Sequence, residues 1–187
     1  MFPILRQIAR IGCITEPAPA ADDALRVTQQ RLDAAMRTKL GRALVIRHVD
    51  AGSCNACELE IHALGNPYYN LEALGIKFAA SPRHADLLLV TGPVAKNMEV
   101  ALRRAYDATP EPRLVVAVGD CGCTGGLFGE SYASCGKVAN VIPVDVAIPG
   151  CPPTPLDLMR GILAALGGGD GESIEAAADT PIAPTQP

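Results

Sequence analysis

Cysteine is the residue type in this chain whose number and spacing could support chemistry. The 187 residues include seven cysteines, at positions 13, 54, 57, 121, 123, 135 and 151. The sequence shows no secretory signal and no apolar run of about 18 residues, so we expect the reducing cytosol as the compartment. In that compartment closely spaced cysteines bind metals more often than they form disulfides. Metal binding is therefore the chemistry to test against the rest of the sequence.

The elements that would position these cysteines are short Leu- and Val-rich runs, typical of strands buried on both faces. Gly, Pro or Asp follows each run, and the runs cover residues 43–49, 86–91, 114–118 and 144–148. Helical patterns follow three of the runs, over 58–64, 94–105 and 156–166. This alternation predicts an α/β fold with an open parallel sheet flanked by helices. Thr154 and Pro155 are the expected N-cap and first residue of the last helix.

Further segments are predicted on either side of this sheet. Residues 1–14 carry a helical stripe, which packs on this chain's own core or is covered by a partner or a membrane: Ile4, Leu5, Ile8 and Ile11. A Pro-rich linker leads to a polar helix that ends near residue 40, with Asp22 or Asp23 as its cap. The narrow buried stripe of that helix would be Leu25, Gln29, Leu32 and Met36. We expect a helical extension and linker over 1–42, the α/β domain over 43–166 and a disordered tail over 167–187.

The predicted sheet brings four of the cysteines together. Cys54 and Cys57 follow the first run, Cys121 follows the third and Cys151 the fourth. Because the carboxyl ends of parallel strands share one edge of a sheet, where α/β proteins bind ligands, these thiols are expected in one small volume. Four thiolates repel one another unless a cation neutralises them, and a 4Fe-4S cluster or a tetrahedral Zn²⁺ would do so.

The spacing of the cysteines favours the cluster over zinc. Structural zinc sites usually combine two local Cys-x-x-Cys pairs, whereas this chain offers one such pair and two isolated cysteines. A cluster is wider than a lone ion and suits ligands that arrive from separate loops. A zinc site and unliganded thiols remain the alternatives.

Composition and the Gly-rich motifs exclude other chemistries. A net charge of −4 and 4% aromatic residues provide neither the basic surface nor the stacking platforms of a nucleic-acid-binding protein. The Gly-rich stretch 119–129 lacks the Gly-x-Gly-x-x-Gly pattern of dinucleotide sites, and Gly136-Lys137 lacks the upstream glycine of a P-loop. We therefore expect no nucleic-acid partner and no nucleotide cofactor.

Other polar residues near the four cysteines have two interpretations. Cys123 and Cys135 either replace a ligand or are small buried side chains, and the second is favoured. Carboxylates at the start of a helix favour capping electrostatics for Glu58 and Glu60, with a proton relay through Glu60 as the alternative. The three histidines show no mutual metal spacing, although the first two could donate to a metal-bound sulfur: His48, His62 and His84.

Four longer motifs resemble the 20 kDa subunit family of NADH:quinone oxidoreductase. They cover residues 52–61, 119–121, 132–136 and 142–153. The likeness extends over about residues 1–166 and is greatest to its hydrogenase branch, the small subunits of group 4 membrane-bound nickel-iron hydrogenases of the formate hydrogenlyase type. The resemblance implies a flavodoxin-like fold that holds one 4Fe-4S cluster, and motif match makes its ligands Cys54, Cys57, Cys121 and Cys151.

The resemblance also implies a function and partners. The chain would be an electron-transferring oxidoreductase subunit without catalytic residues of its own, peripheral on the cytoplasmic face of the cell membrane. Its partners would be a hydrogenase-type large subunit that holds the active site, a ferredoxin-like iron-sulfur subunit and membrane-arm subunits. Quinone-reducing members usually carry adjacent cysteines and an Arg where this chain has Cys54-Asn-Ala-Cys57 and Thr154, so hydrogenase is favoured. A quinone-reducing subunit and a zinc-stabilised assembly scaffold are the alternatives.

Overall fold

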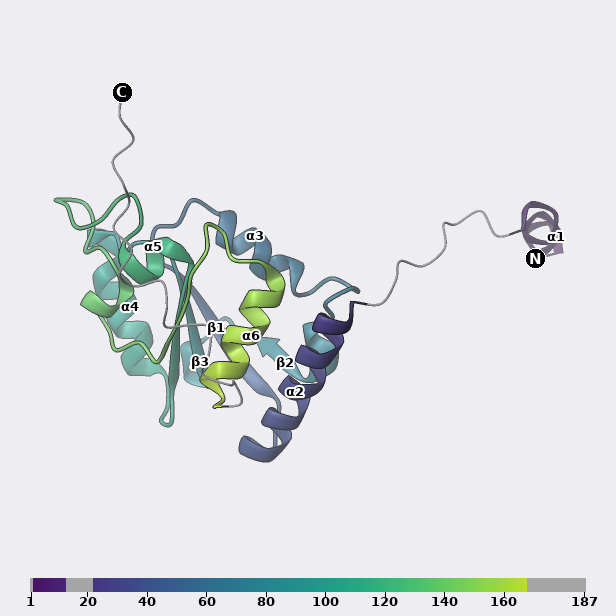
Figure 1. The fold of residues 1–187 in the computed structure, drawn as a ribbon, viewed down its shortest axis with the longest axis horizontal. Helices are drawn as coiled ribbons and strands as arrows, with labels where there is room; N and C mark the ends of the chain where they lie inside the picture. The colour runs from purple at the N-terminus through teal and green to yellow at the C-terminus, as the bar shows by residue number, and fades with distance from the viewer. Residues whose placement is uncertain (1, 13–21, 168–187) are drawn as a thin grey trace, which may run out of the picture.

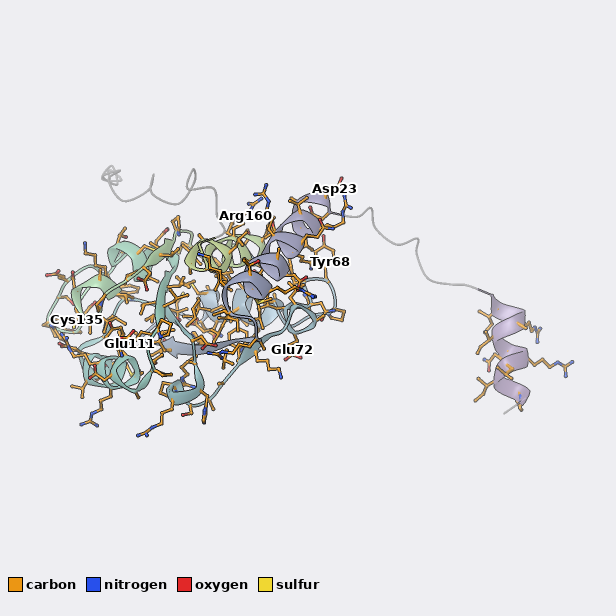
Figure 2. All side chains as sticks on the ribbon, turned by 90° about the horizontal axis from the view of Figure 1, so that it is seen from below. Asp23, Tyr68, Glu72, Glu111, Cys135 and Arg160 are labelled. Atoms are coloured by element: carbon orange, nitrogen blue, oxygen red, sulfur yellow. The ribbon has the colours of Figure 1, made fainter. Side chains whose placement is uncertain are left out.

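The structure, a computed structural model, describes residues 2–12 and 22–167. Cys13, most of the linker predicted after residue 14 and nearly all of the predicted tail lie outside the described residues. The described chain forms one layered α/β body and a separate N-terminal helix, α1 (Phe2–Ile11), which both views show away from that body (Figures 1 and 2).

The body is built on a parallel sheet, as the sequence predicts. Its strands are β1 (Leu44–Asp50), β2 (Ile76–Phe78), β3 (Leu87–Thr91), β4 (Leu114–Val118) and β5 (Val146–Ile148). They lie in the order β2-β1-β3-β4-β5, and every neighbouring pair is parallel. This is the strand order of flavodoxin-like folds, in which ligands bind outside the carboxyl ends of the strands. The fold class predicted from the sequence is confirmed.

Helices cover both faces of the sheet because side chains alternate along each buried strand. Leu87 and Leu89 of β3 join the core beneath α2 (Asp23–Lys39), α3 (Ala56–Ala63) and α6 (Pro155–Ala165). Leu88 and Val90 join the opposite core, which includes residues of α4 (Lys96–Ala108). Figure 1 shows α2 and α6 side by side. Gly161 of α6 lies so close to Ile148 of β5 that a Cβ there would collide with this side chain.

The helix caps follow the predicted signals. The side chain of Asp22 accepts hydrogen bonds from the backbone N–H groups of Ala24 and Leu25, and the Thr154 hydroxyl accepts one from Asp157 N. Leu25, Leu32 and Met36 of α2 are buried as predicted. Gln29 is only half-buried and donates to the Tyr69 carbonyl at 2.8 Å, while Thr28 takes the buried position in its turn.

The sequence patterns missed several short elements, β2 and α5 among them, and misplaced several boundaries; the helix expected over 58–64, for example, is Ala56–Ala63. β2 has three residues at the sheet edge, too few for a periodic signal, and α5 (Gly119–Thr124) consists of Gly, Asp, Cys and Thr without an apolar stripe. The helix expected over 94–105 spans Lys96–Ala108, because Ala95 is still extended at φ −65° and ψ 145°. The last strand is shorter than expected, because Asp145 pairs its backbone and side chain with Val115 at 2.9 and 2.7 Å.

Candidate functional site

Cys54 and Cys57 are held by the loop that leaves β1 and enters α3. Asp50 Oδ1 accepts hydrogen bonds from the backbone N–H groups of Gly52 and Ser53, both at 2.8 Å, which turns the chain sharply. Asn55 adopts φ of 73° just before the first helical residue. This turn leaves Cys54 exposed on the loop and places Cys57 in the first turn of α3, where it is buried.

Cys121 and Cys151 come from two loops that are hydrogen-bonded to each other. Asp120 N donates to the Gly150 carbonyl at 2.9 Å, and Gly150 N donates to Asp120 Oδ1 at 2.7 Å. Cys121 follows on α5 and is half-buried, whereas Cys151 is exposed. Since β4 and β5 are neighbours in the sheet, this reciprocal pair fixes the two cysteine-bearing loops at the same edge.

The four thiols are close enough to affect one another's ionisation. Burial, and then the charges of Glu58, Cys54, Cys121 and Cys151, raise the pKa of Cys57 to about 12. Burial raises the pKa of Cys121 as well, followed by the charges of Cys151, Cys54 and Asp120. Cys57 and Cys121 therefore stay protonated at neutral pH in the absence of a cation. The structure brings together all four sequence-predicted site residues.

Glycines let the backbone approach these sulfurs. A Cβ on Gly119, whose φ is +79°, would lie 2.7 Å from Cys57 Sγ, and a Cβ on Gly126 would lie 3.0 Å from Cys121 Sγ. The first distance is shorter than real Cβ contacts allow, and the second is tighter than most of them. Within the described ranges, no group of three or more His, Cys, Asp or Glu side chains is arranged to hold a single metal ion.

A buried polar network lies behind Cys57, and the sequence patterns did not reveal it. Glu58 is 6% exposed and accepts a hydrogen bond from Ser53 Oγ at 2.5 Å. Its Oε1 has no hydrogen-bond partner among the described residues and lies 3.6 Å from His48 Nε2, which in turn contacts Thr91 Oγ1 at 3.0 Å. Burial lowers the pKa of His48, outweighing the opposing charges of Glu58 and Asp50. Only the packing of β1, β3 and α3 brings these residues together.

The other polar residues singled out in the sequence lie in different surroundings. Glu60 is half-buried, and His62 and His84 are exposed. Cys123 Sγ donates to the Ala117 carbonyl at 3.6 Å, and burial followed by Asp120 raises its pKa to about 12.

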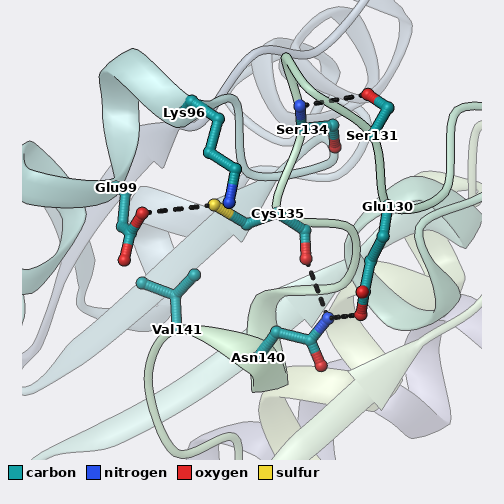
Figure 3. A pocket seen from close by; sticks show the side chains of 8 residues that line it. All are labelled: Lys96, Glu99, Glu130, Ser131, Ser134, Cys135, Asn140 and Val141. Atoms are coloured by element: carbon teal, nitrogen blue, oxygen red, sulfur yellow. Dashed lines mark hydrogen bonds between the residues drawn. The ribbon is translucent and has the colours of Figure 1, made fainter.

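Cys135 lies apart from the four thiols, in the core on the α4 face of the sheet. It is 8% exposed, and its Sγ donates to Glu99 Oε2 at 3.4 Å. The residue borders a polar cavity of about 380 Å³ between α4 and the loop before Val141 (Figure 3). Asn140 closes part of this cavity by donating to Glu130 Oε1 and to the Cys135 carbonyl. The surroundings of Cys135 fit the favoured interpretation, a small buried side chain.

The metal-free chain should show a pH-dependent order of cysteine alkylation. With a pKa of about 12 against an ordinary value of 9.0, Cys57 is about 1,000-fold poorer in thiolate at pH 8 than an ordinary cysteine. Timed iodoacetamide labelling read by mass spectrometry should modify the exposed Cys54 and Cys151 first, and Cys57 and Cys123 last. Raising the pH toward 12 should speed labelling of the last two about tenfold per unit. Equal rates at Cys54 and Cys57 in the folded chain would contradict this, and the denatured chain supplies the control.

Comparison with known proteins adds family information. The model of the family described as NADH ubiquinone oxidoreductase, 20 Kd subunit, matches residues 54–165. Formate hydrogenlyase subunit 7 of Escherichia coli is 43% identical over 136 residues, which are 73% of this chain and 53% of that protein. The probable membrane-bound hydrogenase subunit mbhJ of Pyrococcus furiosus is 44% identical over 127 residues, 68% of this chain and 76% of the relative. An NADH-quinone oxidoreductase subunit of Desulfovibrio desulfuricans is 48% identical over 123 residues, 66% of each chain. The chain thus spans about half the length of the Escherichia coli relative.

Two solved structures share the architecture. A chain of the membrane-bound sulfane sulfur reductase, an archaeal respiratory membrane complex, superposes with a TM-score of 0.60 and 33% identity, over 78% of this chain and 79% of that chain. A chain of the [NiFeSe]-hydrogenase of Dm. baculatum superposes with a TM-score of 0.51 and 16% identity, over 67% of this chain and 63% of that chain. The second likeness is one of fold alone.

Proposed function

The chain belongs to the NADH ubiquinone oxidoreductase 20 kDa subunit family, and we propose that it is the electron-transferring small subunit of a membrane-associated nickel-iron hydrogenase or formate hydrogenlyase complex. It is an oxidoreductase-family subunit, and its relatives include members of membrane-bound hydrogenases. The observation that carries the proposal is the convergence of Cys54, Cys57, Cys121 and Cys151 at one edge of the sheet. We propose that these four thiolates hold one 4Fe-4S cluster.

The donor set fits such a cluster better than it fits a single zinc ion. In a tetrahedral zinc site with Zn–S bonds of about 2.3 Å, the four sulfurs lie about 3.8 Å from one another. The described residues contain no group arranged for a single ion, although the four thiols interact electrostatically. Four cysteines that arrive from three separate loops suit a group wider than a single ion. When bound, a 4Fe-4S cluster supplies a one-electron carrier whose potential depends on burial and on nearby hydrogen bonds.

Different residues of the chain would contribute to holding such a cluster in different ways. Cys57 lies against the apolar core, which excludes water from the inner side of the site. Cys54 and Cys151 are exposed, so the outer side is the one that a partner protein must cover. The reciprocal bonds between Asp120 and Gly150 fix the relative position of two ligand loops. This arrangement leaves the site close to a partner's surface, as electron exchange between subunits requires.

Two local features favour the hydrogenase branch over the quinone-reducing branch. Asn55 and Ala56 separate the first two cysteines, and they provide the left-handed turn and the first position of α3. Thr154 caps α6 and donates its hydroxyl to Asp157 Oδ2 at 2.6 Å, so that this position carries no positive charge. A quinone-reducing subunit remains the second candidate, because the Desulfovibrio desulfuricans NADH-quinone oxidoreductase relative is 48% identical over the shared region.

We propose that the large subunit docks over the loop that follows α5. Large apolar side chains are exposed on this loop: Leu127 at 92%, Phe128 at 61% and Tyr132 at 99%. Gly126, next to Leu127, packs against Cys121 Sγ, so the loop adjoins the proposed cluster ligands. Exposed apolar side chains of this kind mark protein interfaces.

The ferredoxin-like and membrane-arm subunits would complete the complex on the cytoplasmic face of the membrane. No described helix has the length and apolar character needed to cross a bilayer.

Charge placed on this loop should release the large subunit. Phe128→Asp is expected to lower co-purification of the large subunit with the tagged chain by about tenfold or more, because a carboxylate would be buried in an apolar contact. Val100→Asp on α4 is the matched control, since Val100 is also apolar and 56% exposed. Quantitative mass spectrometry of anaerobic pull-downs measures both. Equal release by the two variants would remove the loop from the proposed interface.

Isolation of the intact complex tests the proposed function. The tagged full chain, purified anaerobically, is expected to bring down a large subunit containing nickel, together with hydrogen-dependent reduction of a viologen dye. A complex without nickel that reduces quinone would replace the proposal by the quinone-reducing alternative. Zinc without iron or sulfide in the chain would support the assembly scaffold and overturn the electron-transfer role.

A further inference from the structure

Helix α1 carries an apolar face that the rest of this chain does not cover. Ile4, Leu5, Ile8 and Ile11 are 65%, 58%, 59% and 51% exposed. Figures 1 and 2 show α1 away from the α/β body. The possibility that the stripe packs on the chain's own core is therefore wrong. The two remaining alternatives from the sequence are that a partner protein or a membrane covers this apolar stripe.

The polar and apolar faces of α1 are opposite each other. At 100° per residue, Ile4, Ile8, Ile11 and Leu5 occupy an arc of roughly 120°. Arg6 and Arg10 fall about 160° to 200° from the centre of that arc. Both charged residues of the helix therefore lie opposite the apolar arc, although by its position in the sequence Phe2, the first helical residue, falls on the arginine side.

The charge of α1 differs in sign from that of the remaining chain. The chain has 20 Asp and Glu residues against 16 Lys and Arg residues, and residues 1–12 include Arg6 and Arg10 but no acidic residue. A short basic helix on an acidic protein is attracted to surfaces that repel the rest of the molecule. Anionic lipid headgroups form such a surface on the cytoplasmic side of membranes.

We propose that α1 lies flat in the interface of an anionic bilayer and anchors the chain there. The apolar arc enters the boundary between headgroups and acyl chains, and Arg6 and Arg10 remain on the side of the headgroups. Because a helix is about 10 to 12 Å wide, both guanidinium groups stay within about one Debye length of the lipid charge. At about 15 Å, ten residues are too short to span a hydrocarbon core of about 30 Å. The inference rests on the proposed function only for the location of the complex at a membrane.

An anionic lipid surface explains both the apolar arc and the arginines of α1, whereas a protein groove explains only the apolar arc. A groove in a partner subunit would cover the apolar arc but would gain nothing from arginines on the far face. Self-association of two copies through Ile4, Ile8 and Ile11 would place like charges on both helices without neutralising them. An anionic bilayer uses both features, since insertion and electrostatic attraction add together.

Vesicle sedimentation with the anaerobically purified full chain tests this anchor. We expect binding to phosphatidylcholine vesicles that contain phosphatidylglycerol, weaker binding to pure phosphatidylcholine, and loss of the difference at high salt. Ile8→Glu should raise the lipid concentration for half-maximal binding by about tenfold or more. Val100→Glu is the matched control, because it adds the same charge at an exposed aliphatic position on α4 and should bind as the wild type does. Arg6→Gln with Arg10→Gln should abolish the preference for anionic vesicles.

The outcomes separate this anchor from the proposed function. Ile8→Glu should keep the iron content and the partner subunits of the wild type, since Ile8 is exposed on a helix away from the α/β body that holds Cys54, Cys57, Cys121 and Cys151. Wild-type binding to neither vesicle, or equal vesicle binding by Ile8→Glu and the wild type, would overturn the anchor. Release of a partner subunit by Ile8→Glu, or conversion of a dimer to a monomer, would assign the face to a protein instead. Loss of iron from the wild-type chain would overturn the cluster and leave the vesicle result standing.

Discussion

Cys151→Ser is expected to abolish iron binding by the chain. Cys151 is exposed and contributes little to the core, so its removal should affect a bound metal group and leave the fold intact. A serine oxygen is a much poorer iron ligand than a thiolate, and a 4Fe-4S cluster draws on all four cysteines. Iron per chain after anaerobic purification should fall by about tenfold or more, and the visible absorption of the cluster should disappear with it. Circular dichroism should show an unchanged fold.

Cys135→Ser is the control for this substitution. The thiol of Cys135 is buried among residues of the α4 face and donates to Glu99, apart from the four gathered cysteines. The same chemical change should therefore lower stability modestly and leave the iron content unchanged. If Cys151→Ser retained wild-type iron, or if Cys135→Ser lost it, the proposed ligand set would be wrong.

Gly119→Ala is expected to disturb the site from the backbone side. A methyl group at this position would lie 2.7 Å from Cys57 Sγ, and φ of +79° is disfavoured for any residue with a Cβ. The left-handed conformation alone costs about 1 to 2 kcal/mol. The collision must also displace Cys57 or the loop to Gly150, whose carbonyl lies 3.4 Å from the added atom. We expect a loss of stability of about 2 kcal/mol or more, together with a clear loss of iron.

Gly129→Ala separates the two parts of this effect. Gly129 also has a positive φ, +53°, but a Cβ there would meet nothing within 4 Å. The Gly129→Ala variant should therefore have a free energy of unfolding about 1 to 2 kcal/mol lower, measured with denaturant, and should keep its iron. Should Gly119→Ala bind as much iron as Gly129→Ala, the close approach to Cys57 would have no part in holding the group.

The sequence was sufficient for the fold because its main strands carry a strong physical signal. The Leu- and Val-rich runs at 86–91 and 114–118 coincide with the central strands β3 and β4, which are buried on both faces. The start of α6 at Thr154 was equally predictable, since a Ser or Thr N-cap followed by Pro is typical of a helix N-terminus. Short elements gave no such signal, since β2 has three residues and α5 has six without an apolar stripe.

The candidate site was predictable to the extent that topology alone decides it. Cys54, Cys121 and Cys151 each follow the carboxyl end of a strand, so a parallel sheet gathers them without any knowledge of side-chain packing. The network of Ser53, Glu58 and His48 was not predictable, because it depends on how α3 packs across β1 and β3. The assignment of the four cysteines as cluster ligands stays a prediction.

Iron and acid-labile sulfide, measured on the anaerobically purified wild-type chain together with its EPR spectrum after reduction, test the central proposal most directly. We predict about four iron and four sulfide ions per chain and the signal of a single reduced 4Fe-4S cluster. One zinc ion per chain without sulfide, or iron without the cluster signal, would contradict it.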